Sequence, residues 1–91
     1  MTTASTLAPA QVRPRLTDYV VLDVRTAGEY ASGHIPGAHN VPLDRLPEAV
    51  PVLRRAGHPH LLVVCASGAR SRRARAELTA AGIDAAHLAG G

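Results

Sequence analysis

The sequence predicts a small α/β domain with a largely parallel sheet. Two apolar segments, 19–24 and 61–65, have the continuous, β-branched character of strands that are buried on both faces. Stretches with helical patterns alternate with these strands, as they do in βαβ units. Because 91 residues suffice for one domain, we expect a single domain over residues 7–91 after a flexible segment of residues 1–6.

The N-terminal half of the chain contains four further predicted elements. Leu7 begins a short edge strand, and two prolines limit any helix between residues 8 and 16 to a turn or two. Thr26 and Glu29 have the spacing of a capping box, which predicts a short helix from Thr26. A turn rich in glycine and proline then leads to a short strand over residues 38–41.

The C-terminal half contains two predicted helices and a last strand. Residues 44–56 are mostly helical, and Pro51 predicts a kink or a boundary between two short helices. The clearest helical pattern covers residues 71–81, with Gly82 placed just after its end. Residues 83–88 are expected to return to the sheet as a strand.

Composition and charge narrow the classes of function. The ten basic side chains are all arginine, and the formal net charge of +3 is too small to predict nucleic-acid binding. Cys65 is the only cysteine, which excludes an intrachain disulfide and favours a reducing compartment. The first residues do not have the pattern of a secretory signal, and no apolar run has the length of a membrane span. We therefore expect a cytoplasmic domain with neither a membrane nor a nucleic-acid partner.

The strongest functional signal is the loop at residues 65–71, where an apolar strand gives way to a helix. Small residues follow Cys65, and Gly68 permits a positive φ, so the backbone amides can turn inward and form an anion nest. Together with the helix dipole, this nest should lower the pKa of the thiol. Arg70 adds a forked donor for an oxyanion, and Ser71 is placed to cap the helix and to donate toward the sulfur. The residues expected to bind an anionic substrate are Ala66, Ser67, Gly68, Ala69, Arg70 and Ser71.

An isolated cysteine at the end of a buried strand is usually an inert structural thiol. The small residues, the arginine and the serine that follow Cys65 favour a nucleophile over that structural interpretation.

Three stretches of the sequence resemble the rhodanese family of single-domain sulfurtransferases. They are LDVRTAGEYASGHIPGAHNVPL (22–43), VVCASGARS (63–71) and LAGG (88–91). The resemblance implies a rhodanese-like domain of three layers and a persulfide relay that needs no cofactor. Cys65 would take sulfane sulfur from thiosulfate or a similar donor and pass it to cyanide, to a thiol or to a sulfur-accepting protein. Arg70 would bind the sulfonate end of the donor.

Asp23, Arg25 and Glu29 resemble the D-V-R…E pattern of the same family. We expect Arg25 and Glu29 to form a structural ion pair, and Asp23 to orient the backbone near the rim of the active site. The position after the family's cysteine often holds arginine or another large residue, whereas Ala66 stands here and leaves Arg70 as the only charge in the loop. No metal is expected, because the sequence has no ligand pairs at zinc-site spacing.

Two other functions remain open within this fold. The related cell-cycle phosphatases and arsenate reductases place five residues between cysteine and arginine, whereas four residues separate Cys65 from Arg70. A shorter loop fits a sulfur atom better than a tetrahedral phosphate. The other alternative is a non-catalytic or sulfur-sensing interaction module, although degenerate family members usually lose the cysteine.

Members of the family usually continue beyond L-x-G-G into a final helix. We therefore expect the C-terminal helix to be missing here, either because the chain is truncated or because something else covers the sheet. An exposed apolar patch is expected at that place.

Overall fold

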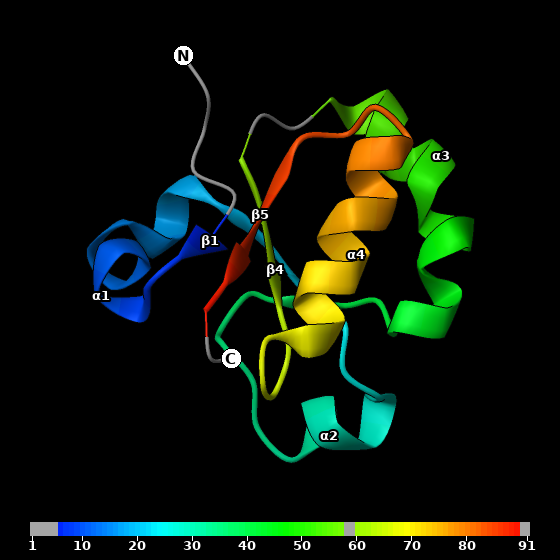
Figure 1. Ribbon diagram of the computed structural model, residues 1–91. Helices are drawn as coiled ribbons and strands as arrows, with labels where there is room; N and C mark the ends of the chain where they lie inside the picture. Colours follow the sequence, from blue (N-terminus) through cyan, green and yellow to red (C-terminus); the bar gives the residue numbers. More distant parts are fainter. Residues whose placement is uncertain (1–5, 58–59, 90–91) are drawn as a thin grey trace.

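A computed structural model describes residues 6–57 and 60–89 (Figure 1). Its five strands form one sheet in the order β1-β5-β4-β2-β3, and every neighbouring pair is parallel. The strands are β1 (Thr6–Leu7), β2 (Val20–Asp23), β3 (His39–Asn40), β4 (Leu61–Val64) and β5 (Ala85–Leu88). The helices are α1 (Pro9–Val12), η1 (Arg13–Asp18), α2 (Ala27–Ala31), η2 (Leu43–Arg45), α3 (Leu46–Ala56) and α4 (Ala69–Ala80). The predicted α/β class and parallel sheet are confirmed.

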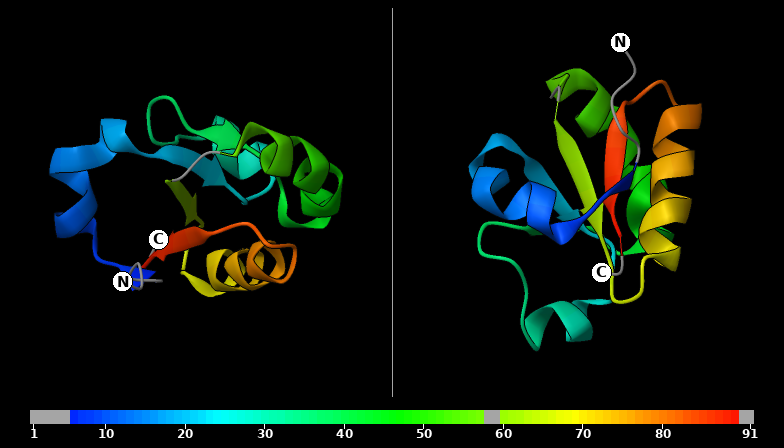
Figure 2. Two further views of the ribbon diagram at one scale, coloured as in Figure 1. Left: turned by 90° about the horizontal axis from the view of Figure 1, so that it is seen from above. Right: turned by 60° about the vertical axis from the view of Figure 1, so that its left-hand side comes forward.

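Helices cover both faces of the sheet, which gives the predicted three layers. Figure 2 shows α3 and α4 on one side, and α1 with η1 on the other. Leu46 of α3 and Leu78 of α4 are fully buried in the first core, where they pack with Val63 of the sheet. Val12 of α1 packs with Leu62 in the second core. Alternate residues of β4 therefore enter opposite cores, as expected for a central strand.

The two central strands end at the same edge of the sheet. In the β2–β4 register Leu22 lies opposite Val63 and Asp23 lies opposite Val64. The amide of Val24 then donates to the carbonyl of Val64 at 3.0 Å. Residues that follow these two strands are thereby brought together, and ligands of parallel sheets bind at this carboxyl edge.

Local sequence signals explain several of the boundaries. The capping box is present: the Glu29 amide donates to Thr26 Oγ1 at 3.2 Å, and the Thr26 amide donates to Glu29 Oε1 at 2.9 Å. Gly82 follows the last residues of α4 with φ +81°, a conformation that favours glycine. Both predictions are confirmed.

The prediction at Pro51 was a kink or a boundary between two short helices, and the boundary is wrong, because α3 runs through that residue. Proline costs the helix one bond, since it has no N–H to donate to the carbonyl four residues earlier, at Pro47. Pro47 and Pro51 are both exposed, so water can satisfy that carbonyl.

The apolar patch expected near the end of the chain stays a prediction. Among the described residues, the one exposed large hydrophobic side chain is Val52 on α3, and Leu88 near the end of the chain is half-buried. The edge of β5 is covered by β1, where Thr6 pairs with His87 and Leu7 with Leu88. Thr6 thus belongs to the sheet, and residues 1–5 of the predicted flexible segment lie outside the described residues.

Candidate active site around Cys65

Cys65 directly follows β4 and faces the first turn of α4. Its side chain is 5% exposed, and it belongs to the core that α3 and α4 cover. Three residues, 66–68, make the turn from the strand into the helix, and Gly68 stands at the N-cap of α4 with φ +92°. A left-handed residue at this point turns the chain sharply enough to place the start of α4 against the sulfur.

The sulfur atom of Cys65 takes the place of a helix cap. Gly68 has no side chain that could accept from the first turn of α4. Instead, Cys65 Sγ accepts from the amides of Gly68 at 3.0 Å and of Ser71 at 3.3 Å. N-cap side chains of serine or aspartate normally accept the N–H of the third helical residue, which is the position of Ser71.

Ser71 connects the sulfur to the loop through its buried hydroxyl. The thiol of Cys65 donates to Ser71 Oγ at 3.5 Å, and that hydroxyl donates to the carbonyl of Gly68 at 3.0 Å. Ser71 was expected to cap the helix, but Gly68 is the N-cap and Ser71 lies within the first turn. The predicted position of Ser71 beside the sulfur is confirmed.

The environment of Cys65 lowers the pKa of its thiol. Burial opposes the charged form and is the largest single effect, but the hydrogen bonds together outweigh it. They come from the hydroxyl and amide of Ser71 and from the amides of Ser67 and Gly68. The amides donate to the sulfur and favour a thiolate, and the Ser71 hydroxyl can turn its proton toward the sulfur once the thiol proton has left. The dipole at the start of α4 acts in the same direction. The loop is therefore suited to hold negative charge on sulfur.

Arg70 does not turn toward the sulfur. Its two terminal nitrogens donate to the Glu29 carboxylate, Nη1 to Oε1 at 2.7 Å and Nη2 to Oε2 at 2.9 Å. This bidentate pair joins the first turn of α4 to α2, and both side chains are about one-third exposed. Arg70 lowers the pKa of Glu29 to about 2, with a further contribution from the amide of Thr26.

The expected ion pair between Arg25 and Glu29 is therefore wrong. Arg25 is instead paired with Asp23, with Nη2 2.7 Å from Oδ2 and Nε 3.0 Å from Oδ1. Asp23 also accepts from the backbone amide of Arg25, so it orients the chain where β2 ends. Arg25 donates onward to the carbonyl of Gly33 at 2.7 Å. Asp23 and Arg25 form a structural clamp, while Glu29 is left free to meet Arg70.

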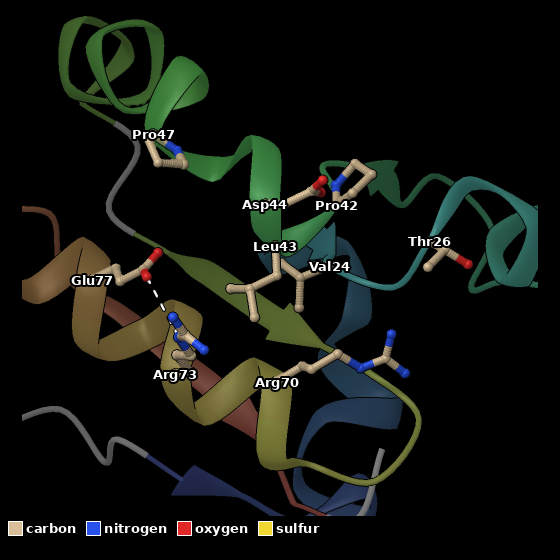
Figure 3. A pocket seen from close by; sticks show the side chains of 9 residues that line it. All are labelled: Val24, Thr26, Pro42, Leu43, Asp44, Pro47, Arg70, Arg73 and Glu77. Atoms are coloured by element: carbon tan, nitrogen blue, oxygen red, sulfur yellow. Dashed lines mark ion pairs between the residues drawn. The ribbon is translucent and has the colours of Figure 1, made fainter.

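A groove of about 460 Å³ lies beside the loop (Figure 3). Figure 3 shows the Arg70 side chain reaching from the start of α4 toward the Thr26 side of this groove. Arg73 faces Glu77 farther along the helix, with Nε 3.7 Å from Oε1. The lining residues are Val24, Thr26, Pro42, Leu43, Asp44, Pro47, Arg70, Arg73 and Glu77. The groove is thus lined by apolar residues together with both acidic and basic side chains.

The model of the rhodanese-like domain family matches residues 8–91 of the chain. This chain belongs to the rhodanese-like domain family. The predicted resemblance is confirmed, and the described sheet and helices are those of such a domain. A search among curated protein sequences finds no match.

Solved structures with the same fold include proteins of different described activity. A rhodanese-like domain protein from Staphylococcus aureus is 31% identical, with TM-score 0.87, over 96% of this chain and 86% of that one. The human single-domain sulfurtransferase TSTD1 is 29% identical, with TM-score 0.82, over 97% of this chain and 91% of that one. A Rhodopseudomonas palustris protein described as a possible tyrosine phosphatase is 24% identical, with TM-score 0.83, over 97% and 76%. At that last identity the likeness concerns the fold alone.

One further buried polar side chain of this rhodanese-like domain is one that the sequence did not single out. His87 on β5 is 5% exposed, and its Nε2 lies 2.9 Å from Thr6 Oγ1. Within the described residues, Nδ1 of His87 is the buried side-chain nitrogen that reaches no hydrogen-bond partner. Burial lowers the pKa of His87, and Arg72 and Arg75 lower it further, against a backbone contact of Leu88.

Neither a metal cluster nor a membrane helix is found in the described part of the chain. Within residues 6–57 and 60–89, no three His, Cys, Asp or Glu side chains lie close enough together to hold a metal ion. None of the helices in those ranges has the length and apolarity needed to cross a bilayer.

Proposed function

We propose that this rhodanese-like domain is a sulfurtransferase that carries sulfane sulfur as a persulfide on Cys65. The observation that supports it most is the sulfur atom at the start of α4, where the amides of Gly68 and Ser71 both donate to it. Such donors stabilise the thiolate that attacks, and they equally suit the charge on a persulfide. Family membership and the sulfurtransferase among the similar structures support the same activity.

The proposed first step transfers one sulfur atom from an anionic donor. The Cys65 thiolate attacks the outer sulfur of thiosulfate, a new S–S bond forms, and the donor's own S–S bond breaks. The electron pair of that bond leaves with sulfite, and the negative charge of the thiolate ends on the outer sulfur of the persulfide. No proton moves in this step, so a preformed thiolate needs no general base.

The proposed second step returns Cys65 to its starting form. A thiolate or cyanide attacks the outer persulfide sulfur, and the bond to Cys65 Sγ breaks with its electron pair remaining on the cysteine. The product is an acceptor persulfide or thiocyanate. A sulfur-accepting protein is the macromolecular partner of this scheme, and a reducing cytoplasmic environment would keep the single cysteine available as a thiolate.

Mass spectrometry of the intact protein after incubation with thiosulfate tests this proposal. We expect Cys65 to gain one sulfur atom, which later addition of cyanide or a thiol should remove. The Cys65→Ser variant should gain nothing under the same conditions.

This assay, together with a phosphatase assay, separates the two alternative functions. Absence of an adduct with thiosulfate and with an alkyl persulfide would leave a non-catalytic interaction module. Turnover of p-nitrophenyl phosphate by wild type, combined with no sulfur adduct, would instead indicate a phosphatase.

A further inference from the structure

The ion pair between Glu29 and Arg70 carries an inference about which sulfur donor the site prefers, and this inference rests on the proposed function. Thiosulfate is a dianion, and its sulfonate end is the kind of group that an arginine fork recognises. In this protein that fork already holds a carboxylate, because both terminal nitrogens of Arg70 donate to Glu29. The one arginine of the loop at residues 65–71 is therefore neutralised by an internal anion.

Glu29 is held in place independently of Arg70. Its Oε1 also accepts from the Thr26 amide at 2.9 Å and from the Thr26 hydroxyl at 3.1 Å. These contacts belong to the capping box of α2, so the carboxylate remains in position when a ligand arrives. A sulfonate that approached the end of the guanidinium would have to displace a carboxylate of similar geometry that is already anchored.

The wider groove does not restore the missing positive charge. Arg73 faces Glu77, and Asp44 also lines the groove. Its four charged side chains are therefore two arginines and two acids, before Glu29 is counted. The amides around Cys65 remain as donors for a single negative charge on sulfur.

We propose that Glu29 is a specificity-determining residue that disfavours dianionic donors such as thiosulfate by occupying Arg70. The favoured donor class is then a small-thiol persulfide, in which no sulfonate accompanies the sulfur to be transferred. With such a donor the Cys65 thiolate attacks the outer sulfur of R–S–SH. The donor S–S bond breaks, R–S⁻ leaves with its electron pair, and the proton stays on the new Cys65 persulfide.

The Glu29→Gln variant tests this inference, because glutamine keeps the capping box while removing the negative charge. The rate of sulfur gain on Cys65 is measured by quenched mass spectrometry with two probes, thiosulfate and 2-hydroxyethyl persulfide. We expect the second-order rate constant with thiosulfate to rise roughly fivefold, the effect of one unit charge a few ångströms from another in water. The rate with the persulfide should change by less than about twofold, because that donor has no sulfonate for Arg70 to bind.

A matched control and a second variant make the assignment specific. Glu48→Gln on α3 removes the same charge from an exposed ion pair with Arg45 of η2, and it should leave both rates unchanged. In an Arg70→Gln background, the gain from Glu29→Gln should disappear, because the two residues act through one contact. The thiosulfate rate of Glu29→Gln should also fall more steeply with added salt than that of wild type.

The outcomes separate this inference from the proposed function. If wild type takes sulfur from either donor but Glu29→Gln leaves the thiosulfate rate unchanged or lowers it, Glu29 does not select the donor and the sulfurtransferase proposal stands. An equal gain with both donors would also overturn the inference. If neither donor transfers sulfur to wild type, the proposed function and this inference fail together.

Discussion

Cys65 and His87 are two buried polar side chains under the same helix, but their surroundings treat charge in opposite ways. Each is 5% exposed, and His87 lies opposite Val63, two residues before Cys65, in the β4–β5 register. The pKa of Cys65 is lowered although burial opposes it, because the donors around the sulfur favour the anion. The pKa of His87 is lowered by burial first and then by Arg72 and Arg75, because both effects oppose the cation.

The comparison shows how one element can favour a negative charge and disfavour a positive one. The start of α4 presents N–H groups to the sulfur, and its arginines lie near the imidazole. The chain therefore favours the thiolate form of Cys65 at one strand end and the neutral form of His87 on the neighbouring strand. Substitutions around Cys65 should therefore change the properties of the thiol and not those of His87, and substitutions at His87 should leave the thiol unchanged.

The largest expected effect comes from Ser71→Ala, which removes the hydroxyl contact to Cys65. We expect the pKa of the thiol to rise and the rate of its alkylation by iodoacetamide at pH 7 to fall about tenfold, as for loss of a hydrogen bond to a charged group. Thr79→Ala removes an exposed hydroxyl farther along α4 and should leave the rate unchanged. Equal rates in wild type and Ser71→Ala would show that the amides alone determine the pKa.

A smaller effect is expected when Gly68 becomes alanine, and Gly82→Ala is its matched control. Both glycines flank α4 with positive φ, +92° and +81°, so alanine should cost each variant about 1–2 kcal/mol of unfolding free energy. Of these two glycines, only Gly68 donates to Cys65, so only the Gly68 variant should also lose alkylation rate. Urea denaturation and the iodoacetamide assay measure the two effects. A loss of thiol reactivity in both variants would mean that general destabilisation, and not the Gly68 amide, is responsible.

The smallest expected effect concerns His87 and acid. A histidine with a lowered folded-state pKa binds fewer protons folded than unfolded. The free energy of unfolding should therefore decrease as pH falls below about 6.5, the ordinary histidine value, until the folded-state pKa is passed. His87→Gln should reduce this dependence, which urea midpoints between pH 8 and pH 5 would show. The exposed His39→Gln should retain it, and an unchanged acid response in His87→Gln would contradict the account.

The features that the sequence predicted depend on nearby residues. The buried strands, the capping box of Thr26 and Glu29, and the glycine after α4 each follow from a pattern only a few residues long. The loop after Cys65 was likewise recognisable, because small residues and a glycine between a strand and a helix allow the backbone amides to turn toward the cysteine.

The features that the sequence did not predict depend on which distant side chains meet. Arg70 lies 41 residues from Glu29, and the spacing of the earlier segment suggested Arg25 as its partner. The contact requires β2 and β4 to end side by side, which only the strand order establishes. His87 was overlooked for the same reason, because its burial depends on the pairing of β5 with β1. Pro51 was misjudged because its tolerance depends on exposure.

The pH dependence of Cys65 alkylation in the wild-type protein is the most direct test of the central claim, that the loop stabilises a thiolate. The chain has one cysteine, so the iodoacetamide signal comes from this residue alone. We expect the midpoint of the rate profile to lie below about 8.5, the value of an ordinary cysteine. A midpoint at or above that value would show that burial outweighs the donors of Gly68 and Ser71, and would contradict the account.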